Sequence, residues 1–201
     1  MDFYMKDYTR NIEINLYDEY IEIISLVQFI FMGNGSIEKE FSFYPWLYRG
    51  VEENTYNFIE VRYNSKSNPN YIIKGEFKKA ANESYVTGGI GICIPFDENV
   101  KEHNITYKSI YYTEYAKFFH SYIFKKYCER FYLSATLRDY RKNKQEDYLL
   151  KWEMFTPNQE YGFNSRRRIS QTDTEIRFSP IEWMTPSCGY IITINQVKHK
   201  K

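Results

Sequence analysis

Three charged residues near the middle of the chain have the types and spacing that could perform chemistry. Glu76 and Lys78 stand two positions apart in the segment 70–79, whose alternation predicts a β-strand, so both side chains should lie on one face. Glu60 belongs to the segment 57–63, the expected preceding strand of the same hairpin. A solvent-exposed sheet face with charge pairs between strands explains these residues equally well. Arg62 and Lys74 alternate in step with them and should therefore lie on the same face.

The same three residues resemble the metal-dependent nuclease arrangement of the restriction-endonuclease-like families. That resemblance implies that Glu60 and Glu76 hold Mg²⁺ while Lys78 assists the attacking water. The usual Pro-Asp of those families is absent, and any chain rich in Glu and Lys produces such triplets. A nuclease is therefore the weaker alternative.

Other catalytic patterns are missing from the sequence. The glycines of "TGGIGI" (87–92) lack the spacing of a dinucleotide or phosphate loop, and no Gly-x-Ser-x-Gly elbow occurs. The three cysteines and three histidines are widely spaced, without a zinc or disulfide pattern. We therefore expect a protein that is not an enzyme, with no metal centre and no small-molecule cofactor.

The composition favours strands over helices. The chain of 201 residues holds 22 Ile, 21 Tyr and 15 Phe against 7 Leu and 4 Ala. Strand patterns occur at 11–20, 21–32, 37–44, 57–63, 70–79, 88–96, 104–112, 147–155, 174–183 and 188–197. The segment 21–32 is apolar on both parities, which predicts a central strand covered on both faces. In 88–96 glycines alternate with isoleucines, so an aromatic ring or another backbone can approach the bare face closely.

One segment, 113–142, carries apolar residues at helical spacing and predicts a long amphipathic helix rich in aromatic residues. Tyr115, Phe118 and Tyr122 would lie on one side of it, behind an N-cap at Thr113. The simplest interpretation of these segments is one α+β domain over residues 1–201. It combines this principal helix with a mostly antiparallel sheet of about eight to nine strands.

The apolar sector of this expected helix is wider than a surface helix needs. Phe124, Tyr127 and Phe131 form a second arc, which loops of the same chain, a partner or stacked bases could cover. Tyr, Phe and Arg are the residues that protein interfaces favour. The stretch "FYPWLYRG" (43–50) offers a similar surface, with Trp46, Tyr48 and Arg49.

Basic residues collect in the C-terminal half. Residues 1–100 have a net charge of −6 and residues 101–201 a net charge of +7. Aromatic rings beside basic side chains can stack single-stranded bases at about 1–3 kcal/mol each. A nucleic-acid interface would use two clusters, namely Lys125, Lys126 and Arg130, and Arg166, Arg167 and Arg168.

The leading hypothesis is a non-enzymatic protein that binds another protein, or further copies of itself, through aromatic surface. Composition biased toward AT-rich codons favours a phage or mobile-element component, such as a virion subunit, an immunity protein or an inhibitor of host defence. The longest apolar run, 23–32, is about half of a membrane span. We therefore expect no membrane association, and a location in the host cytoplasm or in a virion.

Overall fold

The computed structural model describes residues 3–33, 39–48, 56–75, 77–79, 85–142, 144, 146–155 and 169–197. These residues form a protein made almost entirely of β-sheet. Its helical elements within those ranges are two short 3₁₀ turns, η2 (Pro69–Tyr71) and η3 (Tyr115–Lys117). No helix in the described part of the chain has the length and hydropathy needed to span a membrane.

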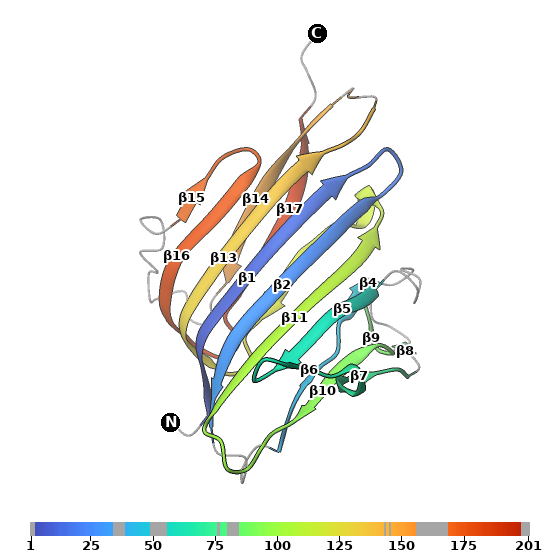
Figure 1. Ribbon diagram of the computed structural model, residues 1–201. Coiled ribbons are helices and arrows are strands. Elements are labelled where there is room, and N and C mark those ends of the chain that lie inside the picture. Colours follow the sequence, from blue (N-terminus) through green and yellow to red (C-terminus); the bar gives the residue numbers. More distant parts are fainter. Residues whose placement is uncertain are drawn as a thin grey trace.

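The main element is a sheet of eight strands in the order β15-β16-β13-β1-β2-β11-β5-β6 (Figure 1). Its strands are β1 (Tyr4–Leu16), β2 (Ile21–Met32), β5 (Tyr56–Tyr63), β6 (Lys66–Ser67), β11 (Glu102–Thr113), β13 (Tyr127–Asp139), β15 (Ile169–Gln171) and β16 (Glu175–Met184). β1 and β13 pair in parallel at the centre, and the other neighbours pair antiparallel. β1, β13 and β11 consequently end at one edge of the sheet, where β2 begins.

Three smaller sheets have the orders β12-β17-β14, β3-β10-β7 and β4-β9-β8. Their strands are β3 (Glu40–Phe43), β4 (Trp46–Tyr48), β7 (Ile72–Ile73), β8 (Phe77–Lys79), β9 (Tyr85–Gly88), β10 (Gly91–Pro95), β12 (His120–Ile123), β14 (Asp147–Phe155) and β17 (Gly189–Val197). Tyr190 of β17 stacks on Phe131, and Phe43 of β3 stacks on Tyr107. The β12-β17-β14 and β3-β10-β7 sheets therefore pack on the same face of the large sheet, which we call its inner face and which points away from the viewer in Figure 1.

The core lies between these layers and is dominated by aromatic rings. The largest fully buried side chains include Tyr8, Tyr107, Tyr190, Phe124 and Phe131. Ring pairs at centroid distances of 5.0–5.9 Å link Tyr8, Phe124, Phe131 and Tyr190, as between Phe124 and Phe131 and between Tyr8 and Phe131. Such tilted and edge-on pairs add to the free energy of burying the ring surface.

The predicted helix over 113–142 is wrong, and so is the α+β fold class. This segment continues from the end of β11 into η3, β12 and β13. Along β13 the buried residues Phe131, Leu133, Ala135 and Leu137 alternate with half-buried ones, which is the period of a strand. β13 pairs with β1 on one side and β16 on the other, so its backbone groups are satisfied by the sheet. The helical spacing arises because a 3₁₀ turn joins two strands.

The expectation of a mostly β-stranded chain is confirmed in part. Strands β2 and β14 occupy 21–32 and 147–155 as predicted, and β2 is central in its sheet. The ring of Tyr44 lies where a Cβ on Gly91 would stand, so an aromatic ring does approach the bare face of 88–96. The predicted hairpin of 57–63 with 70–79 is wrong, because β5 pairs with β11 and β6, and β7 pairs with β10.

Candidate protein-binding surface

The residues predicted to bind a partner are divided between core and surface. Phe124 and Phe131 are fully buried, so their rings are not available to another molecule. The backbone of Phe124 is fixed by hydrogen bonds with Cys188 and Ser187, at 2.8 Å each, which turn its ring inward. Tyr127, at the start of β13, is 39% exposed and keeps the predicted accessibility.

The second predicted surface is described only in part. Trp46 and Tyr48 lie on β4, which pairs with β9, and their side chains lie outside the described part of the structure, as does the whole of Arg49. Their proposed role in binding a partner therefore stays a prediction.

The predicted nucleic-acid residues are partly engaged within the protein. Arg130 forms a two-point ion pair with Asp7, with N–O distances of 2.7 and 2.9 Å. The ammonium group of Lys126 lies 5.8 Å from the ring centroid of Phe3, and Lys125 is exposed in the loop before β13. Arg166, Arg167 and Arg168 lie outside the described residues.

The nuclease candidates are not brought together by the described residues. Glu60 forms an ion pair with Arg62 of the same strand, whereas the charge-pairing alternative supposes pairs between strands. Lys78 lies on β8, in a different sheet, and Glu76 lies outside the described residues. No group of three metal-ligating side chains occurs among the residues that the structure describes.

A cluster of four tyrosines stands at the edge where β1, β13 and β11 end. We call it the hairpin-end cluster, and it comprises Tyr17, Tyr20, Tyr112 and Tyr140. Tyr17 stacks on Tyr20 and Tyr140, with ring centroids 4.9 and 5.6 Å apart, and Tyr20 meets Tyr112 edge-on at 5.7 Å. Tyr20 and Tyr140 remain 41% and 52% exposed. Aromatic surface is therefore concentrated at one point of the exterior.

Sheet pairing places these rings together. Tyr17 and Tyr20 flank the turn from β1 to β2, which is closed by a hydrogen bond from the Tyr17 N–H to the Tyr20 carbonyl at 3.0 Å. Tyr140 directly follows β13, the parallel neighbour of β1, and its N–H donates to the Leu16 carbonyl at 2.9 Å. Tyr112 lies opposite Glu22 in the β11–β2 ladder. The register of four strands thus fixes the cluster.

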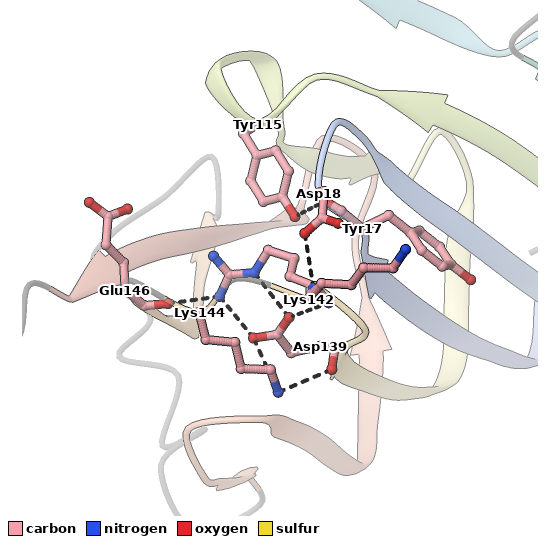
Figure 2. A network of polar contacts seen from close by, with 8 residues as sticks. Tyr17, Asp18, Tyr115, Asp139, Lys142, Lys144 and Glu146 are labelled. Atoms are coloured by element: carbon pink, nitrogen blue, oxygen red, sulfur yellow. Dashed lines mark hydrogen bonds and ion pairs between the residues drawn. The ribbon is translucent and has the colours of Figure 1, made fainter.

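A polar network anchors the loops beneath the hairpin-end cluster (Figure 2). The guanidinium of Arg141 donates twice to Asp139, at 3.0 and 2.8 Å, and once to the Glu146 carbonyl at 2.7 Å. The Lys142 N–H donates to Asp18 at 3.0 Å, and the Tyr115 hydroxyl donates to the Tyr17 carbonyl at 2.6 Å. The network ties the β13–β14 loop and η3 to the β1–β2 turn.

The electrostatics of this region keep Asp139 charged and the phenols of Tyr17 and Tyr112 neutral. The Arg141 guanidinium lowers the pKa of Asp139, mainly through their hydrogen bonds. Burial together with the nearby Glu22 raises the pKa of Tyr17 and of Tyr112 above the usual value. At neutral pH the hydroxyls of Tyr17 and Tyr112 are therefore protonated, so each can both donate and accept a hydrogen bond.

A second, smaller aromatic surface lies at the opposite end of β1. We call it the Trp183 patch, and it comprises Tyr4, Tyr127 and Trp183. Tyr4 pairs with Tyr127 in the β1–β13 ladder, and its ring centroid lies 6.4 Å from that of Trp183. Trp183 is 52% exposed and has a φ of 58°, a left-handed backbone that a bulky residue rarely adopts. Its indole is therefore held outward by a strained backbone.

The hairpin-end cluster was missed from the sequence. The segment "LYDEYI" (16–21) does carry a turn signal, because two acidic residues separate two strand patterns, with a tyrosine on each side. Tyr140, however, was assigned to a helix. Its proximity to Tyr17 depends on the parallel pairing of β1 with β13, which lie more than a hundred residues apart and share no local signal.

Comparisons with known proteins leave the chain without a family. No family model and no curated protein matches its sequence. Among solved structures it is similar to an M1 zinc metallopeptidase from Deinococcus radiodurans, with 8% identity, a TM-score of 0.37, and coverage of 96% of this chain and 42% of that one. It is also similar to yeast LTA4 hydrolase in complex with bestatin, with 10% identity, a TM-score of 0.43, and coverage of 95% and 28%. The chain spans less than half the length of either protein, and likeness at this level shows no shared function.

Proposed function

We propose that this chain is a non-enzymatic protein-binding protein and that the hairpin-end cluster contacts the partner. The observation that carries the proposal is the exposure of Tyr20 and Tyr140 in a stacked cluster whose backbone is anchored from below. The occupant we propose is another protein. A second copy of this chain is an outcome that the experiment distinguishes.

The chemistry of the cluster suits a protein interface. Tyrosine presents a large apolar ring and a polar hydroxyl, and it is enriched where binding free energy concentrates. Each tyrosine ring buries about 150–250 Å² when fully covered. Four half-covered rings supply the centre of an interface of about 800 Å² per partner.

Rigidity is the second property that supports binding. Side chains that are ordered before association lose little conformational entropy on binding, whereas each mobile side chain costs about 0.5–1.5 kcal/mol. Here Tyr17 stacks between the rings of Tyr20 and Tyr140, and its carbonyl accepts a hydrogen bond from the Tyr115 hydroxyl. Arg138 lies beside the cluster, where its pKa is raised by a hydrogen bond with Tyr140 and by Glu13. It provides a charged rim of the kind that surrounds interface centres.

The test compares the two aromatic surfaces. The bait is a full-length chain carrying Tyr20→Ala and Tyr140→Ala, and the matched control carries Tyr127→Ala in the Trp183 patch. Each bait captures proteins from an extract of the cells that express the chain, and the same captured band is quantified by mass spectrometry. We expect Tyr20→Ala with Tyr140→Ala to reduce that band at least tenfold, while Tyr127→Ala leaves it within about twofold.

Three results would overturn this assignment. Equal capture by both baits would show that neither surface is specific, and selective loss with Tyr127→Ala would move the interface to the Trp183 patch. Light scattering on the purified chain tests the third, because a dimer that Tyr20→Ala dissociates would make the occupant a second copy. Circular dichroism of each variant shows whether the fold is retained.

A second candidate function is single-stranded nucleic-acid binding at the Trp183 patch. The exposed rings of Tyr127 and Trp183, with Lys125 exposed nearby, favour it over the other basic sites. A fluorescent single-stranded DNA should then bind at about 50 mM salt, weaken as salt rises, and lose affinity with Trp183→Ala. Absence of binding at that salt concentration would eliminate this candidate. The nuclease and the phage or mobile-element origin remain predictions from the sequence.

A further inference from the structure

A positively charged side chain lies in the middle of the core. Arg10 of β1 is 5% exposed and occupies the inward row between Tyr8 and Ile12. Its Nε donates to the Ser25 hydroxyl at 3.1 Å, and its guanidinium carbon lies 5.4 Å from the ring centroid of Tyr122. The guanidinium therefore sits between the large sheet and β12.

This charge has no acidic counterpart within the described residues. Other arginines in the described part of the chain pair with carboxylates, as Arg130 does with Asp7 and Arg141 with Asp139. No described acidic side chain forms an ion pair with Arg10. Arginine does not lose its proton in proteins, and an isolated buried charge costs several kcal/mol. Some other group must therefore compensate the guanidinium.

The surrounding tyrosines do not supply a negative charge. Burial raises the pKa of Tyr8 well above its ordinary value and also raises the pKa of Tyr107 and Tyr190. These phenols are therefore neutral at physiological pH. Burial and the nearby Arg10 also lower the pKa of His120 well below its usual value, so this ring adds no positive charge.

Unused hydrogen-bonding capacity surrounds the same point. The hydroxyls of Tyr8 and Tyr190 are buried and have only loose contacts with the Tyr122 side chain and the Arg10 guanidinium, and the Nε2 of His120 is buried without a hydrogen bond. The other ring nitrogen of His120 lies 2.8 Å from the Tyr111 hydroxyl. The rings of Tyr8, Tyr122, Tyr190 and His120 converge on one place. The ring centroid of Tyr122 lies 5.2 Å from that of Tyr8 and 6.3 Å from that of Tyr190, and the centroid of His120 lies 6.1 Å from that of Tyr190.

We propose that Arg10 binds a small monovalent anion inside the core, with the hydroxyls of Tyr8 and Tyr190 as further donors. The anion is of the size of chloride or formate, and it accepts hydrogen bonds from the guanidinium and from the phenols. Buried water would satisfy the open donors, but it would leave the charge uncompensated. Tyr122 covers the guanidinium from the side of β12, with its ring centroid 5.4 Å from the guanidinium carbon.

The experiment measures thermal unfolding of the full chain as the anion is changed at constant ionic strength. Sodium chloride and sodium formate are compared with sodium gluconate, whose anion is too large for a closed core. At a hundredfold excess over Kd we expect chloride or formate to raise Tm by about 5–10 °C. Arg10→Met keeps the length of the side chain without its charge, and it should abolish the rise. Arg130→Met, at a partly exposed arginine that pairs with Asp7, should retain it.

A further outcome separates a bound anion from ordinary packing. In gluconate, Arg10→Met should be at least as stable as the wild type, because the uncompensated charge is gone. If Arg10→Met fails to fold, the double variant Tyr8→Phe with Tyr190→Phe keeps the rings and should weaken the anion response at least tenfold in apparent Kd. Equal Tm in all three salts, or an unchanged rise in the Arg10 or tyrosine variants, would overturn the proposal.

Discussion

The hairpin-end cluster and the Arg10 centre use the same residue types in opposite environments. In the hairpin-end cluster, tyrosines stack on one another beside the network of Arg141, whose charge is matched by Asp139 at 2.8 Å. In the core, tyrosines surround Arg10, and no described acid matches it. Tyr20 and Tyr140 are 41% and 52% exposed, whereas the hydroxyls of Tyr8 and Tyr190 are buried beside Arg10 and Tyr122. Where a tyrosine lies relative to solvent thus decides whether its ring or its hydroxyl is left for another molecule.

The contrast also separates two sources of order. The surface cluster is held by hydrogen bonds from several loops and by the register of four strands, so each ring contributes little to overall stability. The core rings are packed on all sides, and their removal leaves a cavity. The same aromatic residue should therefore be important for binding in one region and for folding in the other.

The largest expected effect comes from truncating a ring beside the Arg10 centre. Phe131→Ala should lower the free energy of unfolding by about 3–5 kcal/mol, because the ring is fully buried against Tyr8, Phe124 and Tyr190. Tyr140→Ala, which is half-exposed, should lower it by less than about 1 kcal/mol. Urea unfolding followed by circular dichroism measures both values.

The two variants also decide between the sequence-based and the structural placement of Phe131. A partner-binding ring at the surface would give Phe131→Ala a small loss of stability, similar to that of Tyr140→Ala. Such equality would contradict the buried position and the strand assignment of β13 together.

A second, intermediate effect concerns pH and belongs to the core alone. The pKa of His120 is lowered in the folded state, so the unfolded state binds the proton more readily and stability falls as pH drops below about 6.5. At pH 5 the loss amounts to about 2 kcal/mol from this group. The difference between the wild type and His120→Gln in unfolding free energy, measured from pH 7.5 to 5, isolates this contribution from that of His103.

If His120→Gln shows the same pH dependence as the wild type, His120 is accessible to protons in the folded state. That result would also weaken the case for a closed core around Arg10, because His120 and Arg10 share the same surroundings.

The sequence predicted most strands because their signals are local. Alternation along 147–155 and the apolar run 21–32 mark β14 and β2 without reference to the rest of the chain. The helix over 113–142 was predicted from spacing that a 3₁₀ turn and two strands produce together. Sheet pairing of β13 on both sides decided the outcome, and no local window of sequence contains that information.

The candidate sites were less predictable than the strands. Tyr127 was identified because it is aromatic, yet Phe124 and Phe131 have the same local signal and lie in the core. Arg10 gave no signal, since a lone arginine in an alternating strand is usually solvated. Its burial follows from its parity with Tyr8 and Ile12, and from the second layer of strands that covers them.

The smallest expected effect tests the support beneath the hairpin-end cluster. Asp139→Asn should lower the free energy of unfolding by about 1 kcal/mol, because Arg141 keeps its bond to the Glu146 carbonyl and its place 4.5 Å from the centroid of the Tyr148 ring. The pKa of Asp139 is lowered in the folded state, so the stabilisation from its carboxylate is present at neutral pH and disappears as the pH falls through this lowered pKa.

Glu98→Gln, at an exposed acid, is the control. If partner capture falls with Asp139→Asn but not with Glu98→Gln, the anchoring network orders the tyrosines for binding. If partner capture is unchanged with Asp139→Asn, stacking between the rings alone orders the tyrosines of the hairpin-end cluster. Ring packing would then be the source of order at the surface as well as in the core.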